Sequence, residues 1–154
     1  MSSMTERNQR VRPARWLRAL SVILALFAFG HTFGATSTKV SRGVQEAVLF
    51  RAMQGYRFPV MGFDRSYWDF YRGFAITISV LMFVLAAMAW QLGAVTRRNP
   101  REALPMAVSL LVACVGQLVL SVVFFFAAPI VFSAVSVGVA AWVVVLLRRE
   151  ARGV

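Results

Sequence analysis

The 154-residue chain is unusually apolar, with 59% hydrophobic and 15% charged residues. Soluble globular proteins are typically about 45–50% apolar and about 25% charged, so the composition favours a single membrane domain. The net charge of +11 does not indicate nucleic-acid binding, because sixteen of the seventeen basic residues are Arg and nearly all of them flank apolar tracts. This distribution is typical of membrane topology signals, with anionic lipid headgroups as the counter-charge.

Three tracts without charged residues are 20, 24 and 45 residues long. A membrane-spanning helix takes roughly 20 residues, so the first two tracts each suit one span and the third suits two. We place the break in the third tract at Pro129, because proline removes a backbone donor and disfavours helix in the residue before it. Pro105 then suits the first turn of the third span. The predicted spans are 16–35, 74–95, 104–126 and 130–147.

The basic residues predict how these spans are oriented. Eleven of them lie in the N-terminal segment, the connection between spans two and three, and the C-terminal segment, which share one side of the membrane in a four-span chain. The other six all lie in the loop 36–73, where acidic residues partly offset them. The positive-inside rule therefore places both termini in the cytoplasm.

A cleaved signal peptide is the alternative interpretation of the first span, since a basic start is common to both. No small-x-small pattern ends the tract cleanly, because Phe33 lies two residues before Ala35. Cleavage would leave a three-span protein.

The loop 36–73 carries a helical pattern of its own. A group of apolar residues there is spaced against a group of polar ones, as in a short amphipathic helix that lies at the interface or caps the bundle. Gly55 and Pro59 would end this helix. The apolar group is Val44, Ala47, Val48, Phe50 and Met53. The predicted fold is therefore all-α, an integral membrane four-helix bundle with an amphipathic helix in the loop between the first two spans.

His31, the single histidine, lies near the outer end of the first span. The structural interpretation is that Gly30 and Gly34 form a GxxxG step for close helix packing, that Thr32 bonds to its own helix, and that the imidazole bonds to a backbone carbonyl. The functional interpretation is that an ionisable residue within a span is costly and marks a site, where a side chain that titrates near neutral pH can pass a proton.

The segment 64–74, which leads into the second span, is the other candidate site. Ser66 and Asp69 have the spacing of a capping box. Arg65 and Arg72 both lie within helical reach of Asp69 for an ion pair. Three aromatic residues match the belt at a headgroup boundary: Tyr67, Trp68 and Tyr71.

The topology brings these two candidates to the same face of the membrane. If the first two spans are neighbours, His31 lies near Asp69, Tyr71 or Arg72, and a pair of His31 with Asp69 would fix the charge or tautomer of the imidazole. These four residues form the predicted polar site.

Several small polar residues within the spans favour helix–helix contacts. Gln117 lies close to mid-membrane and most needs a partner. The others are Cys114 and Ser121 on the same stripe as Gln117, Ser133 and Ser136 in the fourth span, and the small pair Ala89 and Gly93 in the second.

Other chemistry has little support. No carboxylate lies within a span, which disfavours a proton-coupled exporter built on an embedded acid. One His and one Cys do not supply an ordinary metal site, and no phosphate-binding loop or nucleophile elbow is present, so we predict no metal and no cofactor.

The motif Gly30-His31-Thr32 with Gly34, together with Asp69-Phe70-Tyr71 and Gly73-Phe74, resembles a family of small uncharacterised bacterial four-span membrane proteins. The resemblance covers the first half of the chain, and the last two spans match only in hydrophobicity. It implies a four-helix fold in the bacterial inner (plasma) membrane and no established activity, so it assigns no functional residues.

We therefore expect a non-enzymatic membrane accessory protein or a binder of a hydrophobic ligand. Its partners would be membrane lipid, a hydrophobic small molecule, a second copy of the chain or another membrane protein. One alternative is a membrane enzyme or quinone-type protein that acts at the outer interface through His31 and the Asp69 segment. A small transporter is the second alternative. An apolar pocket near Gln117 or His31 would favour a binder, and a filled core would favour a packing role.

Overall fold

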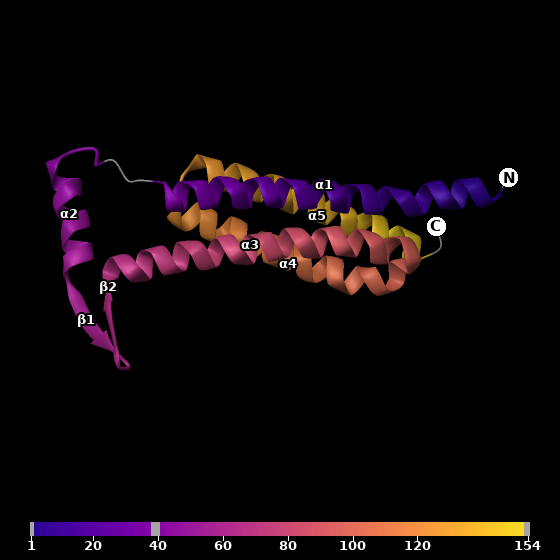
Figure 1. Cartoon of the computed structure of the whole chain (residues 1–154). Coiled ribbons are helices and arrows are strands. Elements are labelled where there is room, and N and C mark those ends of the chain that lie inside the picture. Colours follow the sequence, from indigo (N-terminus) through magenta and orange to yellow (C-terminus); the bar gives the residue numbers. More distant parts are fainter. Residues whose placement is uncertain (1, 38–40, 153–154) are drawn as a thin grey trace. The chain divides into compact units, whose positions relative to one another are not determined.

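The computed structural model describes residues 2–37 and 41–152, with side chains from residue 13 onward (Figure 1). The elements in chain order are α1 (Ser2–Thr36), α2 (Val44–Gly55), β1 (Arg57–Val60), β2 (Phe63–Ser66), α3 (Tyr67–Arg98), α4 (Pro100–Phe124) and α5 (Ala127–Ala151). Within these residues, four stretches are long and apolar enough to cross a membrane: Pro13–Thr36 in α1, and the whole of α3, α4 and α5. The chain is a multi-pass membrane protein, and the prediction of an all-α four-helix bundle is confirmed. Among the seventeen basic residues counted to predict orientation, Lys39 and the side chains of Arg7, Arg10 and Arg12 lie outside the described residues.

The break between α4 and α5 is not at Pro129, as predicted, but at Phe125 and Phe126, which are both extended. Because α5 begins at Ala127, Pro129 lies in its first turn. The first N–H groups of a helix have no intrahelical partner, so proline is tolerated there.

The start of α4 also differs from the prediction. The helix begins at Pro100, and the side chain of Asn99 caps it by accepting hydrogen bonds from the backbone N–H groups of Arg101 (3.1 Å) and Glu102 (3.4 Å). Pro105 therefore lies inside α4 instead of in its first turn. The Asn-Pro pair at the helix start combines a preferred N-cap residue with a preferred first residue.

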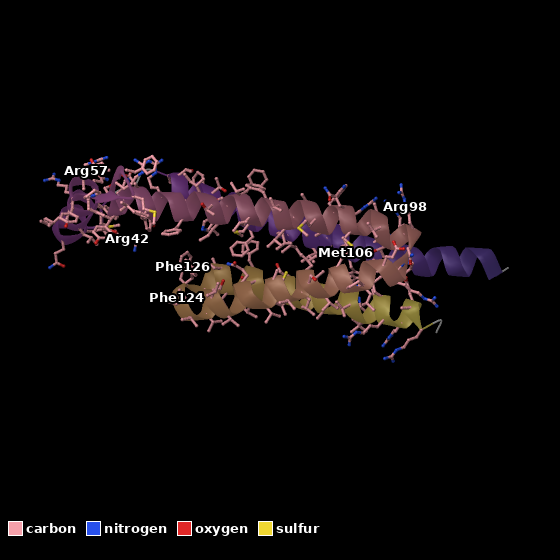
Figure 2. All side chains as sticks on the ribbon, turned by 90° about the horizontal axis from the view of Figure 1, so that it is seen from below. Arg42, Arg57, Arg98, Met106, Phe124 and Phe126 are labelled. Atoms are coloured by element: carbon pink, nitrogen blue, oxygen red, sulfur yellow. The ribbon has the colours of Figure 1, made fainter. Side chains whose placement is uncertain are left out.

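The chain divides into two compact units. The first, here called the bundle unit, comprises residues 1–27 and 82–154, and the second, the α2 unit, comprises residues 28–81. In the bundle unit, basic and apolar residues mark opposite ends: Arg98 lies at the α3–α4 connection, and Phe124 and Phe126 lie at the α4–α5 turn (Figure 2).

All four long helices contribute side chains to the core of the bundle unit, and many of these side chains are small. They are Leu17, Leu20 and Leu24 of α1, Ala86, Ala89 and Leu92 of α3, Ala103, Ala107, Leu110 and Cys114 of α4, and Ala140, Val143, Val144 and Leu147 of α5. Lipid is as apolar as these side chains, so the helices gain by packing closely, and small residues allow that.

Serine hydroxyls add polar contacts between the helices. Ser21 on α1 donates to the carbonyl oxygen of Ala86 on α3 (2.7 Å), and the hydroxyl oxygens of Ser121 on α4 and Ser133 on α5 lie 3.1 Å apart. The predicted interhelical role is thus confirmed for Ser121 and Ser133. Ser136 instead bonds within its own helix.

Close packing of glycine occurs on α3 and not at the predicted GxxxG step of α1. A Cβ atom at Gly93 would lie 3.4 Å from the carbonyl oxygen of Ala14 and 3.7 Å from the Cβ atom of Leu17. A Cβ atom at Gly30 or Gly34 would meet no atom of another element within 4 Å. The packing prediction for Gly30 and Gly34 is therefore wrong within this chain, because the glycine contact between α1 and α3 lies toward the start of α1 and the end of α3.

We predict that Gly93→Leu lowers the free energy of unfolding by about 1–3 kcal/mol, because the larger side chain must displace α1. Gly116→Leu is the matched control, since Gly116 is exposed on α4 and a Cβ atom there meets nothing within 4 Å. Reversible unfolding in mixed micelles measures both. Equal stability of the two variants would contradict the assigned contact.

Candidate functional site

The loop between α1 and α3 folds into a helix and a hairpin. The predicted amphipathic helix is confirmed as α2, and a β-hairpin that was not predicted follows it directly. Strands β1 and β2 pair antiparallel from Arg57 opposite Ser66 to Val60 opposite Phe63. The signal in the sequence is two short runs separated by two residues, but Met-Gly is a weaker hairpin signal than Asn-Gly.

The predicted capping box at the start of α3 is confirmed. The backbone N–H of Ser66 donates to the Asp69 carboxylate (2.9 Å), and the backbone N–H of Asp69 donates to the Ser66 hydroxyl (3.2 Å). The nearby strands hold a separate ion pair, between Arg57 and Asp64 (2.6 Å). The hydrogen bond that Arg57 donates to Asp64 raises the pKa of this guanidinium above its usual range. These carboxylates therefore hold the hairpin and the helix start in place.

His31 does not pair with Asp69. Its Nδ1 atom lies 3.0 Å from the hydroxyl oxygen of Ser79 on α3. Ser79 is ten residues beyond Asp69, which corresponds to about 15 Å along a helix that rises 1.5 Å per residue. The predicted pair fails because α1 meets α3 about three turns inside the helix and not at its first turn.

The hydrogen bonds of Ser79 define the role of the imidazole. The Ser79 hydroxyl donates to the carbonyl oxygen of Ala75 (3.1 Å). A hydroxyl has one proton, so His31 must donate through Nδ1, and the neutral imidazole is the Nδ1–H tautomer. Thr32 bonds to the carbonyl oxygen of Ala28 (2.7 Å), as predicted. His31 thus ties α1 to α3 within the α2 unit.

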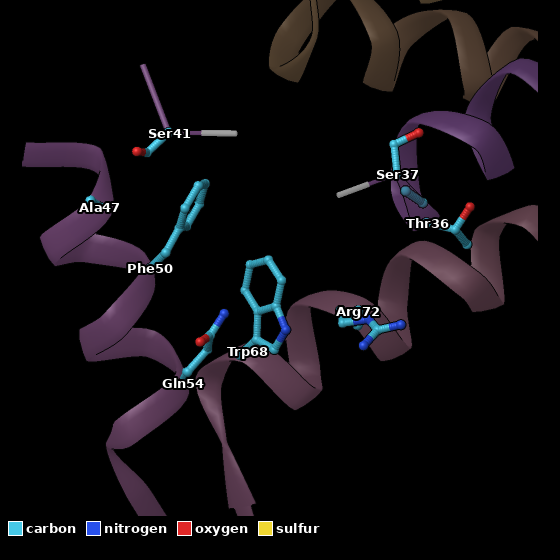
Figure 3. Close-up of a pocket in the computed structure, with 9 residues that line it drawn as sticks. Thr36, Ser37, Ser41, Ala47, Phe50, Gln54, Trp68 and Arg72 are labelled. Atoms are coloured by element: carbon cyan, nitrogen blue, oxygen red, sulfur yellow. The ribbon is translucent and has the colours of Figure 1, made fainter. Parts of the chain in front are cut away.

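A cavity of about 450 Å³ lies among the end of α1, α2 and the start of α3 (Figure 3). Phe50 and Gln54 of α2 face Trp68 of α3 across it. Its lining combines hydroxyls, an amide, a guanidinium and aromatic rings: Ala35, Thr36, Ser37, Ser41, Ala47, Phe50, Gln54, Trp68 and Arg72. We call it the α2 cavity.

Aromatic contacts hold the walls of the α2 cavity together. The Trp68 indole contacts Phe50 edge-on at 5.6 Å between ring centroids and stacks on Tyr71 at 5.4 Å. Tyr71, a predicted site residue, therefore supports the indole from outside the lining. Tyr and Trp favour the boundary between hydrocarbon and water, which is where a cavity at the start of α3 lies.

Arg72 and Asp69 line different cavities. Arg72 lies one turn beyond Trp68 in the α2 cavity, whereas Asp69 lines a second cavity of about 280 Å³ with Arg65, Phe70, Gly73, Phe74 and Thr77. Asp69 and Arg72 are adjacent on the helix surface, but the other residues of the second cavity, such as Phe70 and Phe74, lie on the face of α3 opposite Trp68 and Arg72 because each step turns the side chain by about 100°. Of the four predicted site residues, the structure thus places only Arg72 in the α2 cavity.

The sequence did not predict the hydroxyls and the amide of the α2 cavity. Thr36 and Ser37 donate to the carbonyl oxygens of Thr32 and Phe33, so they present lone pairs and not donors. Gln54 lies within the predicted amphipathic helix, but the sequence does not show which face of this helix turns toward α3.

The polar stripe of α4 forms no comparable site. Cys114 is buried in the core, Ser121 pairs with Ser133, and Gln117 is half-buried and makes no side-chain hydrogen bond within residues 13–37 and 41–152. Within the same residues, no three His, Cys, Asp or Glu side chains come together as metal ligands.

Comparison with known proteins gives no relative. No family model matches the chain, and neither a curated protein nor a solved structure is significantly similar to it.

We predict that Ser79→Ala shifts neutral His31 from the Nδ1–H to the Nε2–H tautomer, because it removes the acceptor of the Nδ1 proton. Since His31 is the single histidine, the ¹⁵N signals of a histidine-labelled protein report this ring alone. Thr77→Ala, on another face of α3, serves as the control and should leave the signals unchanged. Identical spectra for Ser79→Ala and the parent protein would contradict the assigned bond.

Proposed function

We propose that this protein is a non-enzymatic membrane protein that binds an amphiphile with an anionic headgroup in the α2 cavity. The observation that carries the proposal is Arg72. Arg72 lines the cavity, and its guanidinium has no ion pair or side-chain hydrogen bond within residues 13–37 and 41–152. A cation without a carboxylate partner beside a mixed polar and aromatic cavity favours an anion such as a lipid phosphate.

The depth of Arg72 supports this ligand class. The apolar tract of α3 begins at Phe74, two residues farther along, so Arg72 lies where hydrocarbon gives way to headgroups. The Trp68 indole and the Gln54 amide add hydrogen-bond donors to the lining. An anionic headgroup would therefore meet several donors at the depth where lipid carries its charge.

The rest of the cavity suits an apolar chain. Phe50, Ala35 and Ala47 contribute apolar surface to the lining. Phe33, two residues before Ala35 on α1, has a side chain that is 76% exposed. A volume of about 450 Å³ falls within the range of about 300–1,000 Å³ that is common for small-molecule sites. It suits a headgroup with the first part of an acyl chain.

The alternative functions have less support. An enzyme acting through His31 and Asp69 needs these side chains at one cavity, whereas His31 bonds to Ser79 and Asp69 caps α3. A transporter needs a polar path, and on α4 the Ser121 hydroxyl is engaged by Ser133. Neither alternative has an observation in its favour comparable to the unpaired Arg72.

We predict that Arg72→Gln reduces retention of phosphatidylglycerol about threefold to tenfold relative to the parent protein, because it removes a charge-assisted contact at a partly hydrated site. Native mass spectrometry of the full chain, equilibrated with mixed phosphatidylglycerol and phosphatidylcholine, measures the retained lipid. Arg51→Gln removes the same charge from an exposed position of α2 outside the lining, so it should behave like the parent protein. Equal loss in the two variants would contradict the proposal.

We further propose that both termini face the cytoplasm of a bacterial inner membrane, which places α2 and its cavity on the outside. In a Cys114→Ala background, a membrane-impermeant maleimide should label Gln45→Cys in intact bacterial cells. It should label Arg152→Cys only after permeabilisation. Both positions are exposed, so accessibility reports the side of the membrane. Labelling of Arg152→Cys in intact cells would reverse the proposed orientation.

A further inference from the structure

The turn of the β-hairpin presents a large apolar side chain in an unfavourable backbone conformation. Met61 and Gly62 are the two central residues, with φ of 47° and 86°. Positive φ at both positions is the type I′ geometry that suits the twist of paired strands, and Asn, Asp or Gly normally occupies the first position. Here the first position is Met61, whose side chain is 97% exposed. In a turn that faces only water, a methionine at this position gains no free energy from burial that would offset its unfavourable backbone conformation.

The hairpin has one face that is apolar except for Arg65 and one that is polar except for Pro59. Side chains alternate along a strand, so Phe58 and Val60 of β1 share a face with Phe63 of β2. The other face carries the Arg57–Asp64 ion pair. Phe63, next to the turn, is 61% exposed. Residues 60–63, here called the hairpin tip, carry no polar side chain, and Met61 and Phe63 among them are exposed.

Contacts with α3 fix where the hairpin tip points. The Phe58 ring lies 4.9 Å from that of Tyr67 and 6.0 Å from that of Phe70, measured between centroids. β2 ends at Ser66, which is buried and forms the capping box of α3, so no flexible linker separates the hairpin from the helix. Within the α2 unit the hairpin runs crosswise to the start of α3 (Figure 1). The hairpin is thus held rigidly across the axis of a membrane helix.

This placement puts the hairpin tip at the depth of lipid headgroups. Tyr67 precedes the apolar tract at Phe74 by seven residues, or about 10 Å of helix. The headgroup region adds about 5–8 Å to each side of the hydrocarbon, so Tyr67 lies just beyond it. Phe70, which packs against Phe58, precedes Phe74 by four residues, or about 6 Å of helix, and therefore lies within it. The apolar face of the crosswise hairpin thus meets the outer part of the headgroup region.

Arg65 favours lipid over a protein as the partner of the hairpin tip. Its guanidinium lies 5.3 Å from the centre of the Phe63 ring and donates to the carbonyl oxygen of Asp64. A cation laid over an aromatic ring keeps its apolar stem beside the ring and its charge at the headgroups, as basic residues do at a membrane interface. We infer that the hairpin tip inserts Met61 and Phe63 into the lipid surface on the α2 side of the membrane, as an anchor separate from the four spans.

Spin labels test the depth of the hairpin tip. In a Cys114→Ala background, labels at Met61→Cys and Phe63→Cys are compared with one at Pro59→Cys, which is exposed on the polar face two residues from the turn. The full chain is reconstituted in vesicles of three parts phosphatidylcholine to one part phosphatidylglycerol. Collision with oxygen, which partitions into lipid, is compared with collision with a water-soluble nickel chelate.

The expected result is that the labels at positions 61 and 63 collide with oxygen more than with nickel. Their nickel accessibility should be at least about fivefold lower than that of the label at position 59. The label at position 63 measures the depth independently, because Phe63 lies on extended backbone in β2. A local change of backbone caused by replacing Met61, which has a positive φ, therefore does not decide the test. Nickel accessibility at position 63 equal to that at position 59 would overturn the inference. A tip that binds a partner protein instead of lipid would give this result, because in vesicles of the protein alone the tip would be exposed to water. Shielding of all three labels would also overturn it, because the polar face would then be buried as well.

Discussion

The structure depends on one constraint: within lipid, every backbone N–H and C=O group must find its partner inside the protein. Continuous helices meet this requirement, and the long stretches of the chain that are free of charge are accordingly helical. Irregular backbone is confined to the ends of the spans, and at two of these ends side chains complete the missing bonds. Asn99 does so at the start of α4, and Ser66 with Asp69 at the start of α3. The hairpin, α2 and the α2 cavity all lie in the one long segment between spans, where the constraint is relaxed.

Within the spans, small and hydroxylated residues replace the hydrophobic drive that a soluble core would have. Gly93 allows α1 to approach α3, and the hydroxyls of Ser21 and of the Ser121–Ser133 pair bridge neighbouring helices. His31 belongs to the same class, since its imidazole donates to Ser79 and joins two helices. His31, which the sequence suggested as a candidate for proton transfer, therefore has a structural role. Arg72, which has no ion pair or side-chain hydrogen bond within residues 13–37 and 41–152, lies where α3 emerges. The exposed Met61 and Phe63 of the hairpin tip lie on the same side.

The α2 cavity and the hairpin tip are both proposed to contact lipid, but through different interactions. In the cavity, the proposed contact is electrostatic, between the guanidinium of Arg72 and an anionic headgroup. At the hairpin tip, it is the removal of Met61 and Phe63 from water. Both are braced by aromatic rings from the first turns of α3, Trp68 for the cavity and Tyr67 for the hairpin. The start of α3 is thus the framework for both proposed lipid contacts.

The sequence alone determined the spans, the amphipathic helix and the capping box, because each is a local pattern of charge, periodicity or spacing. It did not determine the partner of His31, since that depends on how far along α3 the end of α1 makes contact. It misplaced the α4–α5 break at Pro129, because a proline in a first turn and a proline in a break look alike in sequence. The hairpin was not predicted, because Met-Gly is a weak turn signal in sequence and the turn conformation depends on the pairing of β1 with β2. The membrane fold was therefore legible from composition and pattern, whereas the α2 cavity exists only because tertiary contacts turn Phe50 and Gln54 toward Trp68 and Arg72.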